Sequence, residues 1–235
     1  MSRLILIGGG SSSGKTYITQ NIINKVGADK ITYITLDDYY KDQTEMSMEE
    51  RRKVNYDHPK AFDWPLMRKQ IADLKAGKAI QKPTYDFTIL SRSGKTERIE
   101  PKEVVIAEGI MALVDKELRQ LGDLKVFISA SDERRFLRRI IRDHEERGRT
   151  FENIINQYFS TVQPMYNEIV LPSRNYADVI VNNDGVENLA VDVLTCVVQE
   201  QLLKAESGVL EPSAMDDEFC EKRIAGVFNE DKHQD

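Results

Sequence analysis

The segment from Gly9 to Thr16 constrains this chain more than any other part of its sequence. It reads Gly-Gly-Ser-Ser-Ser-Gly-Lys-Thr and follows the apolar run from Leu4 to Ile7, with a helix-like segment after it. A strand, the pattern GxxxxGK[ST] and a helix in this order predict a P-loop, whose backbone N–H groups and helix N-terminus surround a phosphate. The alternative is a flexible Gly/Ser turn before an ordinary helix.

The residue types of this loop predict a division of roles. Glycines let successive N–H groups point at the β-phosphate. Lys15 would reach the β- and γ-phosphates, and the Thr16 hydroxyl would ligate Mg²⁺. The predicted nucleotide-binding residues are Gly9, Gly10, Ser11, Ser12, Ser13, Gly14, Lys15 and Thr16. The motif indicates a nucleoside triphosphate but does not identify what receives its phosphoryl group.

Short apolar runs separated by helical patterns predict β-α-β winding and a mostly parallel sheet. With the phosphate loop, the expected fold class is α/β, the three-layer α/β/α fold of P-loop NTPases. A helix is expected from about Asp63, its N-cap, to Ala76. The predicted strands cover residues 4–7, 31–36, 104–107, 125–128 and 178–181.

Two segments depart from this alternation, and the chain is expected to end in a tail. Residues 79–101 are rich in aromatic and β-branched side chains and break at Ser93-Gly94, which predicts a small β-hairpin insertion for the second substrate. Residues 132–150 are dense in arginine. The kinase domain is expected to span residues 1–205, followed by an acidic, weakly ordered tail over residues 206–235.

Composition excludes several classes of protein. With 33 basic and 39 acidic side chains, the net charge of -6 disfavours nucleic acid and anionic membranes as partners. No apolar run is long enough to span a bilayer. Two cysteines without a metal-site spacing fit a reducing cytoplasm, and removal of the N-terminus as a signal peptide would destroy the glycine loop.

Acidic residues directly follow two predicted strands, at Asp37 and Glu108. Ligands of open α/β sheets bind beyond the carboxyl ends of the strands. Phosphoryl transfer to an alcohol needs a carboxylate that accepts the hydroxyl proton and an acid that helps hold the metal. A solvated turn acid for Asp37 and a helix-cap partner for Glu108 are the alternatives.

The arginine-rich segment predicts an amphipathic helix followed by a lid. Phe136, Leu137, Ile140 and Ile141 are expected on the packed face, and Arg135, Arg138, Arg139 and Arg142 on the opposite, anion-binding face. Arg147-Gly148-Arg149 would close over phosphates. The alternative is an exposed helix laced with salt bridges, because acids are interspersed among the arginines.

These blocks together resemble the uridine kinase (uridine-cytidine kinase) family, within the phosphoribulokinase/uridine kinase group of P-loop kinases. The resemblance covers roughly residues 4 to 185. Besides the P-loop, it rests on DDYYKD (37–42), YDHPKAFD (56–63), PTYDF (83–87), EGI (108–110), RRIIRD (138–143), ERGR (146–149), QY (157–158) and YADVI (176–180).

The resemblance implies roles for individual residues and a homo-oligomer, commonly a tetramer. Asp37 would be the base for the ribose 5′-hydroxyl, assisted by Lys15, Arg142, Arg147 and Arg149. Magnesium would be held by Thr16, Glu108 and Asp37. The nucleoside would contact Tyr56, Asp57, Tyr85, Phe87, Arg139 and Gln157. Family members generally carry a base-reading histidine where this chain has Leu90, which cannot donate that hydrogen bond.

The expected reaction is transfer of the γ-phosphoryl of ATP or GTP to the 5′-hydroxyl of uridine or cytidine, giving UMP or CMP in pyrimidine salvage. Leu90 leaves open another small alcohol, such as a different riboside, a sugar phosphate or a pantothenate-like acceptor. A non-catalytic NTP-binding regulator is the alternative of a different class. Against a guanine-specific switch, this chain lacks the Asn-Lys-x-Asp motif of such proteins, since Asn24-Lys25 is followed by Val26-Gly27.

Overall fold

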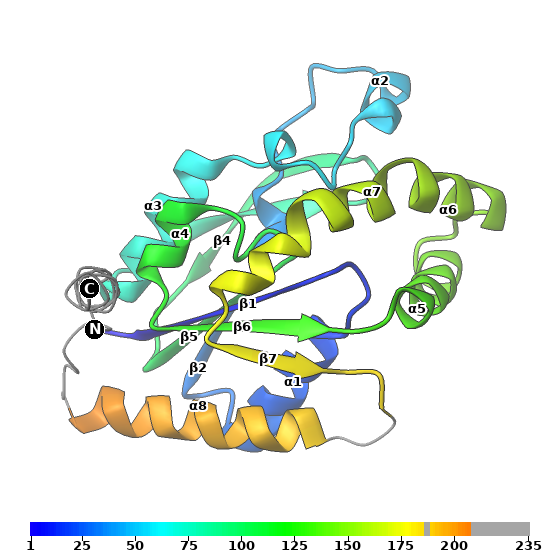
Figure 1. Cartoon of the computed structure of the whole chain (residues 1–235). Helices are drawn as coiled ribbons and strands as arrows, with labels where there is room; N and C mark the ends of the chain where they lie inside the picture. Colours follow the sequence, from blue (N-terminus) through cyan, green and yellow to red (C-terminus); the bar gives the residue numbers. More distant parts are fainter. Residues whose placement is uncertain (186–188, 208–235) are drawn as a thin grey trace, which may run out of the picture.

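The central element of the fold is a parallel sheet. The computed structural model describes residues 1–185 and 189–207. Within these residues, five strands pair in the order β2-β5-β1-β6-β7, all parallel (Figure 1). Their bounds are Arg3–Gly9 for β1, Ile31–Thr35 for β2, Val104–Glu108 for β5, Leu124–Ser129 for β6 and Val179–Asn182 for β7.

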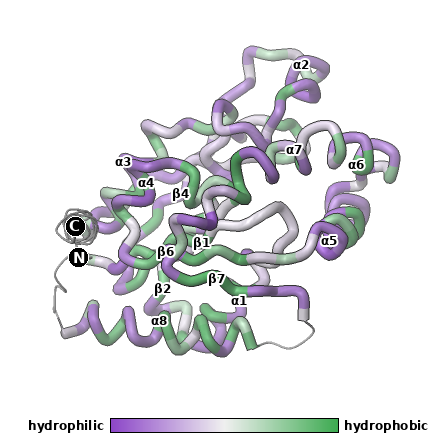
Figure 2. The backbone as a smooth tube through the Cα atoms, in the orientation of Figure 1, coloured by the Kyte–Doolittle hydropathy of each residue, from purple (hydrophilic) through white to green (hydrophobic). Residues whose placement is uncertain are grey.

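Helices cover both faces of this sheet, which is why its strands are apolar on both sides (Figure 2). α1 (Lys15–Val26) and α8 (Leu189–Ser207) pack on one face. α3 (Trp64–Lys75) and α4 (Lys116–Leu121) pack on the other, together with Tyr166 and Val170. The predicted three-layer α/β/α architecture is confirmed.

The remaining helical elements include two that lie near the carboxyl ends of the strands (Figure 1). A nearly continuous helical run from Phe151 to Tyr176 contains two π-helical turns. The elements are η1 (Leu36–Tyr39), α2 (Met48–Lys53), η2 (Pro59–Ala61), α5 (Asp132–Glu145), α6 (Phe151–Gln157), η3 (Tyr158–Val162), α7 (Gln163–Met165), η4 (Tyr166–Val170) and η5 (Pro172–Tyr176). In Figure 1, α5 and α6 lie beyond the tips of the strand arrows.

Local sequence chemistry sets the helix starts. The Asp63 side chain accepts a hydrogen bond from the Leu66 backbone N–H, as predicted for the N-cap of α3. Ser47 and Glu50 form a reciprocal capping box at the start of α2. Such caps satisfy backbone donors that have no partner inside the helix.

The predicted β insertion is a two-stranded antiparallel hairpin, β3 (Ile80–Asp86) and β4 (Ser91–Ile99), separate from the main sheet. The predicted break at Ser93-Gly94 is wrong as a turn, because the turn lies at residues 87–90. Gly94 instead has a φ of 76° inside β4, where the pairing register shifts. A glycine with positive φ there marks a bulge that bends the hairpin.

The predicted faces of α5 are wrong. Arg135 and Arg139 are buried, whereas Leu137 and Ile141 are 59% and 55% exposed. The Arg135 guanidinium stacks 3.5 Å from the centre of the Tyr166 ring. Helical periodicity separates two faces but does not show which one meets the rest of the molecule. In this chain the charged face points inward, because the helix borders a polar site.

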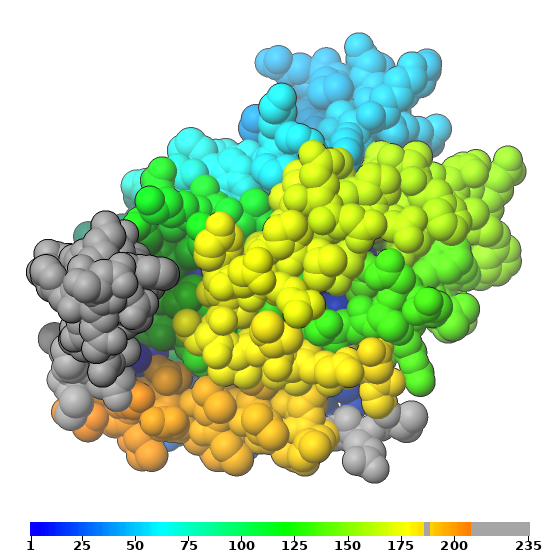
Figure 3. Space-filling model, viewed as in Figure 1, coloured from blue at the N-terminus to red at the C-terminus, as the bar shows by residue number. Residues whose placement is uncertain are grey.

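On the face in Figure 3, the N-terminal segment is visible only in small patches between later parts of the chain. This agrees with the almost complete burial of β1. No helix among the described residues has the length and apolar composition needed to cross a membrane. Nearly all of the predicted tail, residues 208–235, lies outside the described residues.

Position in the sheet should decide how much an isoleucine contributes to stability. Ile106 is 0% exposed in the inner strand β5, whereas Ile180 is 49% exposed in the edge strand β7. We expect Ile106→Ala to lower the free energy of unfolding by about 2–5 kcal/mol, because it leaves a cavity. Ile180→Ala should cost less than about 1 kcal/mol. Urea unfolding followed by circular dichroism measures both, and equal losses would contradict the assigned burial.

Candidate active site

The predicted phosphate loop joins β1 to α1 with an unusual backbone. Gly9 and Gly14 have φ values of 144° and 98°, and Ser12 also has a positive φ, of 60°. A Cβ on Gly9 would lie 2.4 Å from the Ile128 carbonyl oxygen, and one on Gly14 would lie 2.1 Å from the Asn183 amide nitrogen. Both φ values favour glycine, and a side chain would also clash with the β6 backbone at Gly9 and with the Asn183 side chain at Gly14.

Lys15 is buried at the first residue of α1. Its ammonium donates to the carbonyl oxygens of Gly9 and Gly10 at 3.1 and 3.0 Å, within its own loop. Burial lowers the pKa of Lys15, while the carboxylates of Glu108 and Asp37 oppose that shift. The lysine side chain is therefore held against the phosphate loop by backbone carbonyl groups of that loop.

Two carboxylates stand beside this loop because their strands are neighbours. Glu108 ends β5 and pairs in register with Ile7 of β1 and Thr35 of β2. Its Oε1 atom accepts hydrogen bonds from the hydroxyls of Thr16 and Tyr33, each at 2.8 Å. Glu108 is thus fixed at the start of α1, with only 4% of its surface exposed.

Asp37 lies in η1, directly after β2. Burial raises the pKa of Asp37 to about 6, the Glu108 carboxylate adds to the rise, and Lys15 and two arginines oppose it. The neighbouring Asp38 is turned to the hairpin instead, where it pairs with the buried Lys82 and accepts from the Tyr85 N–H at 3.1 Å. These contacts fix the hairpin relative to Asp37.

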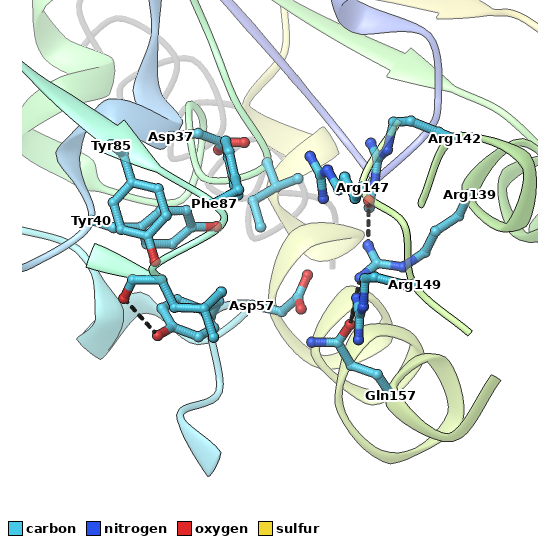
Figure 4. A pocket seen from close by; sticks show the side chains of 14 residues that line it. Asp37, Tyr40, Asp57, Tyr85, Phe87, Arg139, Arg142, Arg147, Arg149 and Gln157 are labelled. Carbon is cyan, nitrogen blue, oxygen red and sulfur yellow. Dashed lines mark hydrogen bonds between the residues drawn. The ribbon is translucent and has the colours of Figure 1, made fainter. Parts of the chain in front are cut away.

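Aromatic side chains form one wall of a cavity that opens beside Asp37 (Figure 4). The rings of Tyr40 and Tyr85 have centroids 5.1 Å apart, and those of Tyr85 and Phe87 are likewise 5.1 Å apart. The Tyr56 hydroxyl lies 2.7 Å from Gln43 Oε1 and 3.2 Å from the Leu90 carbonyl oxygen. The hairpin and the segment before η2 therefore build this wall together.

The opposite wall is formed by arginines of α5 and of the following turn, together with the neutral amide of Gln157 in α6 (Figure 4). Gln157 Oε1 accepts from Arg139 at 2.9 Å and from Arg149 at 2.6 Å, while Arg139 also donates to the Ser11 hydroxyl at 2.8 Å. The Arg147 guanidinium lies 4.5 Å from the centre of the Phe87 ring, so the two walls meet. Gln157 thus orients arginines rather than standing alone.

A second cavity lies along the phosphate loop and shares residues with the first. Its walls include Ser11, Ser12, Gly14, Lys15 and Thr16, whereas Gly9, Gly10 and Ser13 do not line it. The other predicted site residues line one or both cavities. The predicted residues that line both are Ser11, Asp37, Phe87, Arg142 and Arg147, and Ile110, which was not predicted, lines both as well.

Several lining residues escaped the sequence reasoning. Tyr33 and Thr35 line the loop cavity from the same side of β2, and Arg138, which was expected on the anion-binding face of α5, also lines it. Tyr40 joins the aromatic wall. Alternation could have revealed Tyr33 and Thr35, because side chains two apart in a strand share a face. Tyr40 belongs to a recognised block, but its sequence position does not show that its ring faces the cavity.

The described residues fit a bound magnesium nucleotide. They contain no cluster of three or more His, Cys, Asp or Glu residues suited to a metal ion. Mg²⁺ usually takes only one or two protein ligands and completes its shell with phosphates and water, so Thr16 and Glu108 suffice. The buried hydroxyl of Ser12, which lines the loop cavity, has no hydrogen-bond partner, which suits a loop that receives phosphate oxygens.

The raised pKa of Asp37 means that its ionised carboxylate destabilises the folded chain. Between about pH 4 and pH 6 the folded chain binds more protons at Asp37 than the unfolded chain, so its contribution to stability falls as pH rises. Asp37→Asn should therefore be more stable than the wild type above pH 6, by up to about 3 kcal/mol, with the gain vanishing below about pH 4. Urea unfolding from pH 4 to 8 measures this, with the exposed Glu45→Gln as control. A pH-independent difference would contradict it.

Comparisons with known proteins agree with this geometry. A model of the phosphoribulokinase / uridine kinase family matches residues 4–190. Uridine kinases from Limosilactobacillus reuteri (strain DSM 20016) and Streptococcus gordonii are each 46% identical to this chain, covering 86% and 88% of it and 94% and 99% of the relatives.

Solved structures share the fold at low sequence identity. Phosphoribulokinase from Rhodobacter spheroides has a TM-score of 0.63 at 12% identity, covering 87% of this chain and 99% of that one. D-glycerate 3-kinase from Cryptococcus neoformans has a TM-score of 0.58 at 17% identity, covering 77% and 86%. With the family model and the close relatives, the conclusion is that this chain belongs to the phosphoribulokinase/uridine kinase family.

Proposed function

We propose that this protein is an ATP-dependent nucleoside kinase that phosphorylates the 5′-hydroxyl of a pyrimidine nucleoside, uridine or cytidine. The observation that carries the proposal is the position of Asp37, which lines both the phosphate-loop cavity and the aromatic cavity. A donor in the first and an acceptor in the second would meet at this carboxylate. The 46% identical relatives named uridine kinase support the same reaction.

Asp37 acts as the base in this proposal. It accepts a hydrogen bond from the acceptor hydroxyl and takes its proton as the oxygen attacks the γ-phosphorus, while the bond from that phosphorus to the leaving diphosphate oxygen breaks. With a pKa of about 6, the group is mostly ionised at neutral pH and more basic than an ordinary aspartate. Arg142 and Arg147, which line both cavities, are placed to stabilise charge on the transferred group.

Donor binding is assigned to the phosphate loop. Lys15 would exchange its loop carbonyls for β- and γ-phosphate oxygens, and Ser11 and Ser12, which line the loop cavity, would offer hydroxyls and N–H groups. Thr16 and Glu108 would hold magnesium, with Asp37 nearby. The ion, when bound, neutralises phosphate charge. ATP is the proposed donor, and GTP is the alternative.

Acceptor binding is assigned to the aromatic cavity. Tyr56, Tyr85 and Phe87 would hold a base against their rings. Asp57 lines the same cavity opposite Arg139, where it suits the ribose hydroxyls. Burial raises the pKa of Asp57 even though Arg139 and Arg142 oppose that rise, so hydroxyl donors would relieve a buried carboxyl.

Replacing the base tests the reaction. Asp37→Asn should lower kcat by about 10²- to 10⁴-fold, because the amide cannot accept the proton. A coupled assay of ADP release with uridine and cytidine measures it, and Glu45→Gln serves as an exposed control. Near-full turnover in Asp37→Asn would remove Asp37 from the role of base. Hydrolysis that no acceptor in a panel of nucleosides, sugar phosphates and pantothenate stimulates would instead indicate an NTP-binding regulator.

We propose that Leu90 limits recognition of the base, because it cannot donate a hydrogen bond to it. Its φ is 52°, a conformation that histidine tolerates better than leucine. We expect Leu90→His to raise kcat/KM for uridine or cytidine about tenfold, because it adds a donor at the cavity edge. Ile89→His is the control, since Ile89 is exposed and does not line the cavity. Equal effects of both substitutions on nucleoside kinetics would contradict this role.

A further inference from the structure

Asp143 lies at the centre of the arginine wall but has no part in the transfer proposed above. It stands in the last turns of α5 and is 0% exposed. A buried carboxylate costs free energy unless charged groups and hydrogen bonds compensate it. The compensation comes from four arginines that also line the acceptor cavity.

Each carboxylate oxygen of Asp143 contacts two of these arginines. Oδ1 accepts from Arg142 at 2.9 and 2.8 Å and lies 3.3 Å from an Arg147 nitrogen. Oδ2 accepts from Arg149 at 3.3 Å and lies 3.5 Å from Arg139. The Asp143 carbonyl oxygen also accepts from the Arg149 backbone N–H at 3.0 Å.

These contacts fold the turn after α5 back onto the helix. Gly148, between Arg147 and Arg149, has a φ of 62°, which lets the chain reverse there. Without Asp143 the guanidinium groups would repel one another, and Arg147 and Arg149 could swing toward water. Burial alone would raise the pKa of Asp143, but Arg142, Arg139 and Arg147 together hold it below its usual value.

We propose that Asp143 is a positioning residue that gathers Arg139, Arg142, Arg147 and Arg149 around the transfer site before the nucleotide binds. The proposal rests on the kinase function above. Preorganised donors stabilise a transition state without having to rearrange at the moment of reaction. Asp143 acts through the arginines and need not touch either substrate.

This role predicts opposite effects on binding and on turnover. Asp143 is an anion that shares its arginines with the incoming phosphates, so it opposes nucleotide binding while it fixes the geometry. Removing its charge should leave nucleotide affinity unchanged or higher and lower kcat. A purely structural role for Asp143 in holding α5 would instead weaken nucleotide binding and turnover together.

The test compares Asp143→Asn with Glu145→Gln, which changes an exposed acid to an amide on the same helix. Calorimetry with the magnesium complex of a non-hydrolysable ATP analogue gives Kd, and the coupled assay gives kcat and KM. We expect Asp143→Asn to lower kcat about 10- to 100-fold with Kd equal to or below that of the wild type. The control should match the wild type in both.

Two outcomes would overturn the proposal: an unchanged kcat, or a Kd at least tenfold weaker. If Asp143→Asn fails to fold, Asp143→Glu replaces it, because it keeps the charge and shifts the carboxylate by one methylene. That variant should lose turnover at unchanged Kd, and wild-type kcat would count against positioning. If the wild type phosphorylates no nucleoside, the proposed function fails, whereas the Kd comparison still tests how Asp143 affects nucleotide binding.

Discussion

The parallel alignment of the strands is the constraint on which the site depends. Parallel strands share a carboxyl edge, so the loops that follow them meet in space although they are distant in the chain. Here Glu108 pairs with Ile7 and Thr35, which puts β5 beside the strands that lead to the phosphate loop and to Asp37. The buried apolar residues of the sheet thereby determine where the polar residues stand.

The polar groups gathered at this edge are only partly compensated. Glu108 is held by two hydroxyls, Asp143 by four arginines, and Lys15 by loop carbonyls. Asp37 differs, because burial and a neighbouring carboxylate both raise its pKa. Natural active sites commonly sacrifice stability in this way, since a reactive group must stay available to its substrate.

The β3–β4 hairpin and the turn after α5 lie over the carboxyl edge of the sheet and contact each other. The hairpin is fixed to η1 through Lys82 and Asp38, and its turn carries Phe87. The turn after α5 carries Arg147, whose guanidinium lies over the Phe87 ring. This contact joins the aromatic wall to the arginines, so a movement of the hairpin or of the turn would alter the binding sites of both substrates.

The sequence by itself determined the phosphate loop, the parallel α/β architecture and the candidate acids, because these depend on local patterns and strand order. Ordered motifs also indicated the arginines and aromatic residues of the two walls. Tertiary structure alone decided that the charged face of α5 turns inward, that the hairpin turns at residues 87–90, and that Tyr33 supports Glu108. The reason is physical: a helical or strand period identifies faces, but only packing against the other elements decides which face is buried.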